Sequence, residues 1–170
     1  MADTDYFAEL YVAGRFADAG WNVYFPHRDK GFDFVISKPG RDGRQFLRPV
    51  QVKGKYPTGA KTDKRVYGYV GRLSQTHPDM ILAIPFFSAD STDMPVCTAY
   101  MMRRHIKPSS RGFACQPAMF RGGMPILRRD FAKYFDRSGL LLLMAPKRRS
   151  NSPPPPPVAI PVAAILLRPR

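Results

Sequence analysis

The sequence predicts an α/β domain in which helices flank one central mixed β-sheet. Three observations support this fold class. A segment with helical periodicity stands first, segments with the two-residue alternation of strands follow it, and a later, strongly apolar stretch is typical of a strand buried on both faces. Because these segments share a chain of 170 residues, we expect one layered domain around a single core.

The first helix is predicted over residues 3–20. Asp3 or Thr4 can cap its start, its apolar residues recur near helical spacing, and Gly20 suits its end. A short strand is predicted next, over residues 21–26.

Two further strands, over residues 32–37 and 45–55, are predicted to pair as a hairpin. The Pro and Gly residues between them favour a turn. Alternation along the first of these strands turns Asp33 away from its aromatic neighbours. Pro49 interrupts the second strand, because proline cannot donate to a central ladder, and it marks either a bulge or the start of the well-paired part.

The second half of the chain contains two more apolar strands and a final helix. The predicted elements are a helical turn at 69–76, strands at 79–87 and 95–102, a basic loop at 103–125 and a helix at 125–139. We expect the domain to occupy residues 1–146. Residues 147–170 are basic and proline-rich and are predicted to form a disordered tail.

The charge of the chain points to a polyanionic partner. The sequence has 27 basic and 13 acidic residues, a net charge of +14 and a pI of about 10.2. Five of the basic residues and no acidic residue lie in the tail, so most of the positive charge belongs to the domain. DNA is the expected partner; the alternative is a soluble basic protein with no specific partner.

Nothing in the sequence indicates a secreted or membrane-bound protein. The start of the chain is acidic and lacks the basic and apolar regions of a signal peptide. The apolar stretch at 158–167 is interrupted by Pro161 and is shorter than the ~20 residues that span a bilayer. Cys97 and Cys115 are expected to be buried free thiols. We therefore expect a soluble, cytoplasmic protein without a membrane partner.

Three polar residues are unusual for the apolar strands that carry them. Gln51 and Lys53 share one face of their strand, about 7 Å apart, and Asp33 can reach the same face if the two strands pair. An acid, an amide oxygen and a lysine suit metal-assisted phosphodiester cleavage. Asp33 and Gln51 would bind Mg²⁺, or Mn²⁺ in its place, with the main-chain carbonyl of Val52, and Lys53 would orient water or stabilise the transition state.

Asp33 followed by Gln51-Val52-Lys53 resembles the core of the PD-(D/E)XK nuclease superfamily, in the form with glutamine for the second acid. The chain is similar to Mrr-like restriction endonucleases and, more loosely, to Holliday-junction resolvases, over roughly residues 5–87. The resemblance implies a restriction-endonuclease-like core. It also assigns Glu9 on the first helix to the catalytic and metal site. The chain departs from the pattern because a phenylalanine, and not proline, precedes Asp33.

These residues also have simpler explanations. Asp33 can simply be an acid at the start of a strand, with its carboxylate in a salt bridge to Lys53. Gln51 and Lys53 can lie on a solvated face of their strand. His27 can sit beside the metal or in a surface loop. A stretch of basic residues and tyrosines after the second hairpin strand either grips a phosphate backbone or forms a solvated loop. Its candidate nucleic-acid-binding residues are Lys55, Lys61, Lys64, Arg65, Tyr67, Tyr69 and Arg72.

The leading hypothesis is a metal-dependent DNA endonuclease that hydrolyses phosphodiester bonds by metal-activated water. Double-strand cleavage would favour a homodimer with two active sites. The alternative is a catalytically inactive nucleic-acid-binding module on the same fold. A weaker hypothesis is an adaptor whose polyproline segment docks into a partner.

Overall fold

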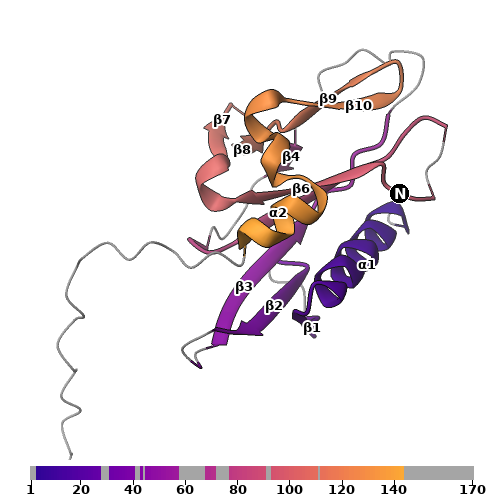
Figure 1. The fold of residues 1–170 in the computed structure, drawn as a ribbon. Helices are drawn as coiled ribbons and strands as arrows, with labels where there is room; N and C mark the ends of the chain where they lie inside the picture. The colour runs from indigo at the N-terminus through magenta and orange to yellow at the C-terminus, as the bar shows by residue number, and fades with distance from the viewer. Residues whose placement is uncertain are drawn as a thin grey trace, which may run out of the picture.

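The protein is an α/β domain built on a mixed five-stranded sheet (Figure 1). The computed structural model describes residues 3–27, 31–40, 43, 45–57, 68–71, 77–90, 93–110 and 112–143. The elements in chain order are α1 (Asp3–Asp18), β1 (Asn22–Tyr24), β2 (Phe34–Pro39), β3 (Gln45–Val52), β4 (Gly68–Gly71), β5 (Ile81–Phe86), β6 (Cys97–Met102), the 3-10 helix η1 (Arg103–His105), β7 (Lys107–Ser109), β8 (Gly112–Cys115), β9 (Ala118–Arg121), β10 (Met124–Leu127), the 3-10 helix η2 (Arg129–Tyr134) and α2 (Asp136–Leu143).

The central sheet has the strand order β1-β2-β3-β5-β6. Strands β1, β2 and β3 form an antiparallel meander, β3 runs parallel to β5, and β5 is antiparallel to β6. The predicted hairpin of β2 and β3 is therefore confirmed. Two smaller sheets, β4-β8-β7 and the hairpin β9-β10, complete the strands.

Pro49 is tolerated in β3 because of the place where β5 begins. Val50 and Val52 turn their main-chain groups toward the β2 side, since the Val50 carbonyl accepts from Asp33 and the Val52 amide donates to it. Residues of the other parity, Pro49 included, face the β5 side. Pairing between β3 and β5 starts only at Val50 opposite Ile81. Pro49 therefore lies before the paired part of β3 and β5, so its lack of an N–H removes no hydrogen bond between these two strands.

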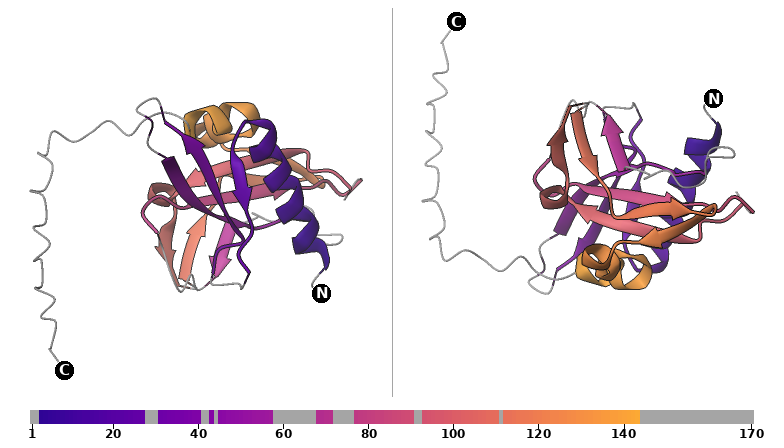
Figure 2. Two further views of the ribbon diagram at one scale, coloured as in Figure 1. Left: turned by 90° about the horizontal axis from the view of Figure 1, so that it is seen from below. Right: turned by 90° about the horizontal axis from the view of Figure 1, so that it is seen from above.

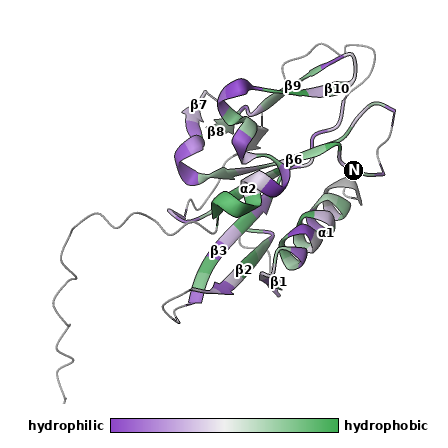
Figure 3. Ribbon diagram, in the orientation of Figure 1, coloured by the Kyte–Doolittle hydropathy of each residue, from purple (hydrophilic) through white to green (hydrophobic). Residues whose placement is uncertain are grey.

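Both faces of the central sheet are covered. One face packs against α1 and α2 through a core that includes Val12, Phe34, Val50 and Leu140. The other face packs against the smaller sheets and η2 through a second core. All six residues of β5 are buried, as predicted for a strand covered on both faces. Figure 2 shows the helices on one side of the central sheet and the small sheets on the other. The hydropathy colours alternate along β3 in Figure 3.

Helix α1 packs through residues four apart in the sequence. Ala8, Val12 and Phe16 are fully buried, which is the spacing of one helical face. The ring of Phe16 lies 5.4 Å from the ring of Tyr100 in edge-to-face geometry. The helix ends as predicted near Gly20, whose φ of +80° is a conformation that favours glycine.

The basic loop expected at 103–125 is wrong. This segment contains η1, β7, β8, β9 and the first residues of β10. Its strands are only three or four residues long, so alternation within any one of them is hard to detect. Gly122 and Gly123 have φ of +57° and +75°, and two such residues form the tight turn that joins β9 to β10. The Gly-Gly pair was thus a hairpin signal.

The helix expected at 125–139 is also wrong. Pro125 lies in β10 opposite Phe120, and a 3-10 helix comes next. The α-helix begins only at Asp136, whose φ of +48° breaks the helical path before it. The Asp136 carboxylate accepts a hydrogen bond from the Thr98 amide at 2.9 Å. A tertiary contact with β6 therefore sets this boundary.

Three further expectations concern the rest of the chain. Part of the helical turn at 69–76 is instead strand β4, and residues 72–76, like the tail at 147–170, lie outside the described residues. Cys97 and Cys115 are buried free thiols, as predicted. No helix in the described part of the chain has the length and hydrophobicity needed to cross a bilayer.

Two glycines provide a matched test of the helix packing. A Cβ at Gly139 in α2 would lie 2.1 Å from the carbonyl oxygen of Tyr134, whereas a Cβ at Gly14 in α1 meets nothing within 4 Å. Gly139→Ala should lower the free energy of unfolding by about 3 kcal/mol. Gly14→Ala should raise it by about 0.5–1 kcal/mol. Urea denaturation measures both, and two changes of the same sign would contradict this packing.

Candidate functional site

Asp33 lies where β2 separates from β3. Its main-chain amide donates to the carbonyl of Val50 at 3.0 Å, and its Oδ2 accepts from the amide of Val52 at 2.5 Å. These two contacts lie on either side of Gln51 in the sequence. The carboxylate of Asp33 is therefore held beside the segment that carries Gln51 and Lys53, as the hairpin predicted.

Gln51 carries a buried polar atom that lacks a hydrogen bond. Its side chain is 9% exposed, and its Oε1 has no hydrogen-bond partner among the described residues. Gln51 pairs in register with Leu82, a member of the second core, so it lies on the face opposite α1. A buried amide oxygen without a partner is costly. The solvated strand face proposed as its simpler explanation is therefore wrong for Gln51.

Val52 and Lys53 continue the same segment. The amide of Val52 points to Asp33, and the carbonyl of the same residue faces that side as well. Lys53 is partly buried, and its amide donates to the carbonyl of Ala83 at 2.9 Å. Pro85 has no N–H to offer the next carbonyl of β3, which explains why the ladder ends at Val52 and resumes only as a bridge at Lys55.

Glu9 approaches this segment from the other face of the sheet. It is partly buried on α1, next to Ala8, which belongs to the core beneath that helix. A Cβ at Gly54 would lie 3.3 Å from the Cβ of Ala8. The helical turn with Glu9 thus lies beside the residue that follows Lys53. A glycine directly after Gln-Val-Lys is the sequence signal for this close approach.

Asp33 and the segment beside it carry oxygen atoms of the kind that Mg²⁺ prefers. They are the Asp33 carboxylate, the amide oxygen of Gln51 and the main-chain carbonyl of Val52. Within the described ranges, no three His, Cys, Asp or Glu side chains gather closely enough to hold a metal ion. Glutamine in place of a second acid leaves Asp33 as the one carboxylate of this donor set.

The other predicted site residues are more scattered. His27 is exposed in the segment after β1, which agrees with a surface position. Lys55 is partly buried and follows β3 at its bridge to Phe86. Tyr69 belongs to β4, whose side chains are not described. The remaining candidate nucleic-acid contacts lie outside the described residues: Lys61, Lys64, Arg65, Tyr67 and Arg72.

Comparison with known proteins does not assign this chain to a family. The chain matches no family model, and no curated protein matches it significantly.

The buried Oε1 of Gln51 leads to a prediction about the stability of the metal-free protein. Gln51→Met keeps most of the side-chain volume and removes the buried amide, so in EDTA it should raise the free energy of unfolding by about 1–3 kcal/mol. Gln45→Met is the matched control, because Gln45 is exposed in the same strand, and it should change stability by less than about 0.5 kcal/mol. A Gln51→Met protein that is less stable than the wild type would show that the amide is satisfied.

Proposed function

We propose that this chain is a Mg²⁺-dependent DNA endonuclease whose core is like that of the PD-(D/E)XK nuclease superfamily. The observation that carries the proposal is the buried Oε1 of Gln51, which has no hydrogen-bond partner among the described residues, on the segment whose Val52 amide binds the carboxylate of Asp33. A cation held by these two side chains would give the Gln51 oxygen a partner. The net charge of +14 supports a polyanionic substrate.

In this proposal, the residues of the candidate site have separate roles in phosphodiester hydrolysis. Mg²⁺ would supply positive charge to the phosphate and lower the pKa of a coordinated water. Asp33 and Gln51 would hold the ion, and the hydrogen bond from the Val52 amide fixes the direction of the Asp33 carboxylate. Lys53 extends from the next position on the same face and donates to the scissile phosphate or to the attacking water. By the resemblance to the superfamily, Glu9 would orient water from the α1 side of the sheet.

The alternative is a nucleic-acid-binding module without catalysis, and one observation favours it. Asp33 already has a structural partner in the Val52 amide, so its presence does not require a metal. Gln51 brings no negative charge to attract one. Isothermal titration with Mg²⁺ separates the two functions: the endonuclease binds the ion and loses binding on Asp33→Asn, whereas the module shows no affinity that depends on Asp33.

Asp33→Asn separates the chemical role of the residue from its structural role. The amide oxygen of Asn can still accept from Val52, so the melting temperature should change little while the metal ligand loses its charge. Cleavage of plasmid DNA in Mg²⁺ should fall at least about 100-fold. Lys53→Ala should cause a loss of similar size. EDTA should abolish cleavage by the wild type.

Asp18→Asn is the matched control, because Asp18 is exposed at the other end of α1 from the Glu9 turn. Its cleavage rate should equal that of the wild type. DNA binding in EDTA, measured by fluorescence anisotropy, should persist in all three variants. Cleavage that survives both Asp33→Asn and Lys53→Ala would remove this mechanism.

A further inference from the structure

A second group of basic residues gathers on η1, β7 and η2. We call Arg103, Arg104, Lys107 and Lys133 the basic platform. Arg104, Lys107 and Lys133 are exposed, and the short helices and β7 that carry the platform are coloured hydrophilic in Figure 3. The first three residues lie in the segment predicted as a basic loop, but nothing in the sequence joins them to Lys133, which lies 26 positions beyond Lys107.

His105 joins the two parts of the platform. Its ring lies 4.4 Å from the ring of Tyr134 in η2, and its Nδ1 accepts a hydrogen bond from the amide of Met102 at 3.1 Å. Burial, and then the charges of Arg104, Lys107 and Lys133, lower the pKa of His105 to about 4. The charges that act on His105 are all positive, so these three cations share one region of positive potential.

Aromatic rings hold two of the cations in place. The guanidinium of Arg103 lies 5.2 Å from the ring centre of Phe113 and donates to the carbonyl of Ile106 at 3.0 Å. The Lys133 ammonium lies 5.2 Å from the ring centre of Tyr134. Cations held in this way lose less conformational entropy when they bind an anion.

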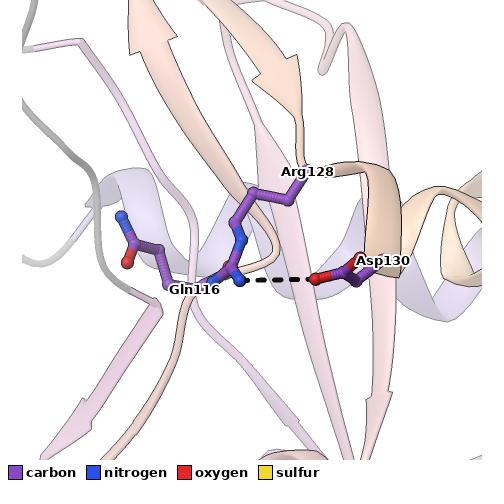
Figure 4. A network of polar contacts seen from close by, with 3 residues as sticks. All are labelled: Gln116, Arg128 and Asp130. Atoms are coloured by element: carbon purple, nitrogen blue, oxygen red, sulfur yellow. Dashed lines mark hydrogen bonds and ion pairs between the residues drawn. The ribbon is translucent and has the colours of Figure 1, made fainter.

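Arg128, close to the platform in sequence and structure, differs from the platform residues because an acid neutralises its charge. It forms an ion pair with Asp130 at 3.7 Å and donates to the carbonyl of Gln116 at 3.2 Å (Figure 4). Arg128 is therefore neutralised by an acidic side chain and is not counted in the platform. The platform brings several positive charges together, and an external polyanion would relieve the repulsion between them.

The platform lies on the same side of the central sheet as the candidate metal site. Phe32, the neighbour of Asp33, packs against the same core as Phe131 and Tyr134 of η2. Val50 pairs with Ile81, and Ile81 pairs with Met102, the residue before η1. Two strand spacings, about 10 Å, therefore separate β3 from the start of the platform. A DNA duplex is wide enough to contact both.

We propose that the basic platform binds the phosphate backbone of the DNA next to the candidate metal site. The choice of DNA as the polyanion rests on the proposed function, whereas backbone binding needs no cleavage. The platform carries charge without base-reading geometry, so it contributes affinity that is independent of sequence and sensitive to salt.

The test compares two double variants of equal charge. Arg104→Gln/Lys107→Gln removes two exposed cations of the platform. Arg121→Gln/Arg137→Gln removes two exposed cations near the other end of the β5-β6 pair, where Ala89 bonds Gly123 and Asp136 bonds Thr98. Binding of a labelled 20-base-pair duplex is followed by fluorescence anisotropy in EDTA from 50 to 300 mM KCl, with circular dichroism as a check of folding.

The platform variant should bind the duplex about tenfold more weakly, and its log–log salt slope should be shallower by about 2. The control variant should keep nearly the affinity and slope of the wild type. Equal losses in the two variants, or an unchanged platform variant, would overturn the proposal. So would a platform variant that binds DNA normally but loses binding to phosphatidylserine vesicles. Because EDTA prevents cleavage, a failed nuclease assay leaves this result intact.

Discussion

The hydrogen bond from the Val52 amide to the Asp33 carboxylate fixes the geometry on which the candidate site depends. Strands β2 and β3 pair regularly as far as Phe34 opposite Val50. Beyond this pair the strands separate, and a side chain takes the place of the main-chain partner that Val52 has lost. The end of the ladder thus holds the Asp33 carboxylate beside the segment that carries Gln51 and Lys53.

The fold can hold a costly group at this point because the surrounding sheet is well buried. Strand β5 is covered on both faces, and two apolar cores flank the sheet. An unsatisfied buried amide costs about 1–3 kcal/mol, a large fraction of a typical net stability of 5–15 kcal/mol.

Sequence patterns predicted the central sheet and failed where contacts between distant segments decide the structure. The alternation around Gln51 depends on the pleat of a long strand, and the structure places Gln51 on the face that this alternation implies. Asp33 instead precedes β2, and Phe32 packs on the core opposite to that of Phe34, so the alternation expected for Phe32, Phe34 and Ile36 begins only at Phe34. The predictions of a loop and a helix after Met102 were wrong for two reasons. Strands of three or four residues are too short to show a clear alternation. The start of α2 depends on a hydrogen bond between Asp136 and β6. The local sequence encodes neither that bond nor the contact between α1 and Gly54.

For the candidate site, the sequence identified residue types and spacing but could not supply burial. The burial of the Gln51 side chain depends on the layer of η2 and the small sheets on this face, a region that the sequence predicted as a loop and a helix. The joining of Lys133 to the cations of η1 likewise depends on the packing of His105 against Tyr134.

The two thiols give the protein an internal reporter of its own opening. Burial raises the pKa of both Cys97 and Cys115 to about 12, so in the native state they stay protonated and shielded from reagents. An unfolded chain regains an ordinary thiol pKa near 8.5 and exposes both groups. Alkylation by iodoacetamide therefore proceeds through transient openings of the β6 and β8 layers, and its rate records how often those layers part.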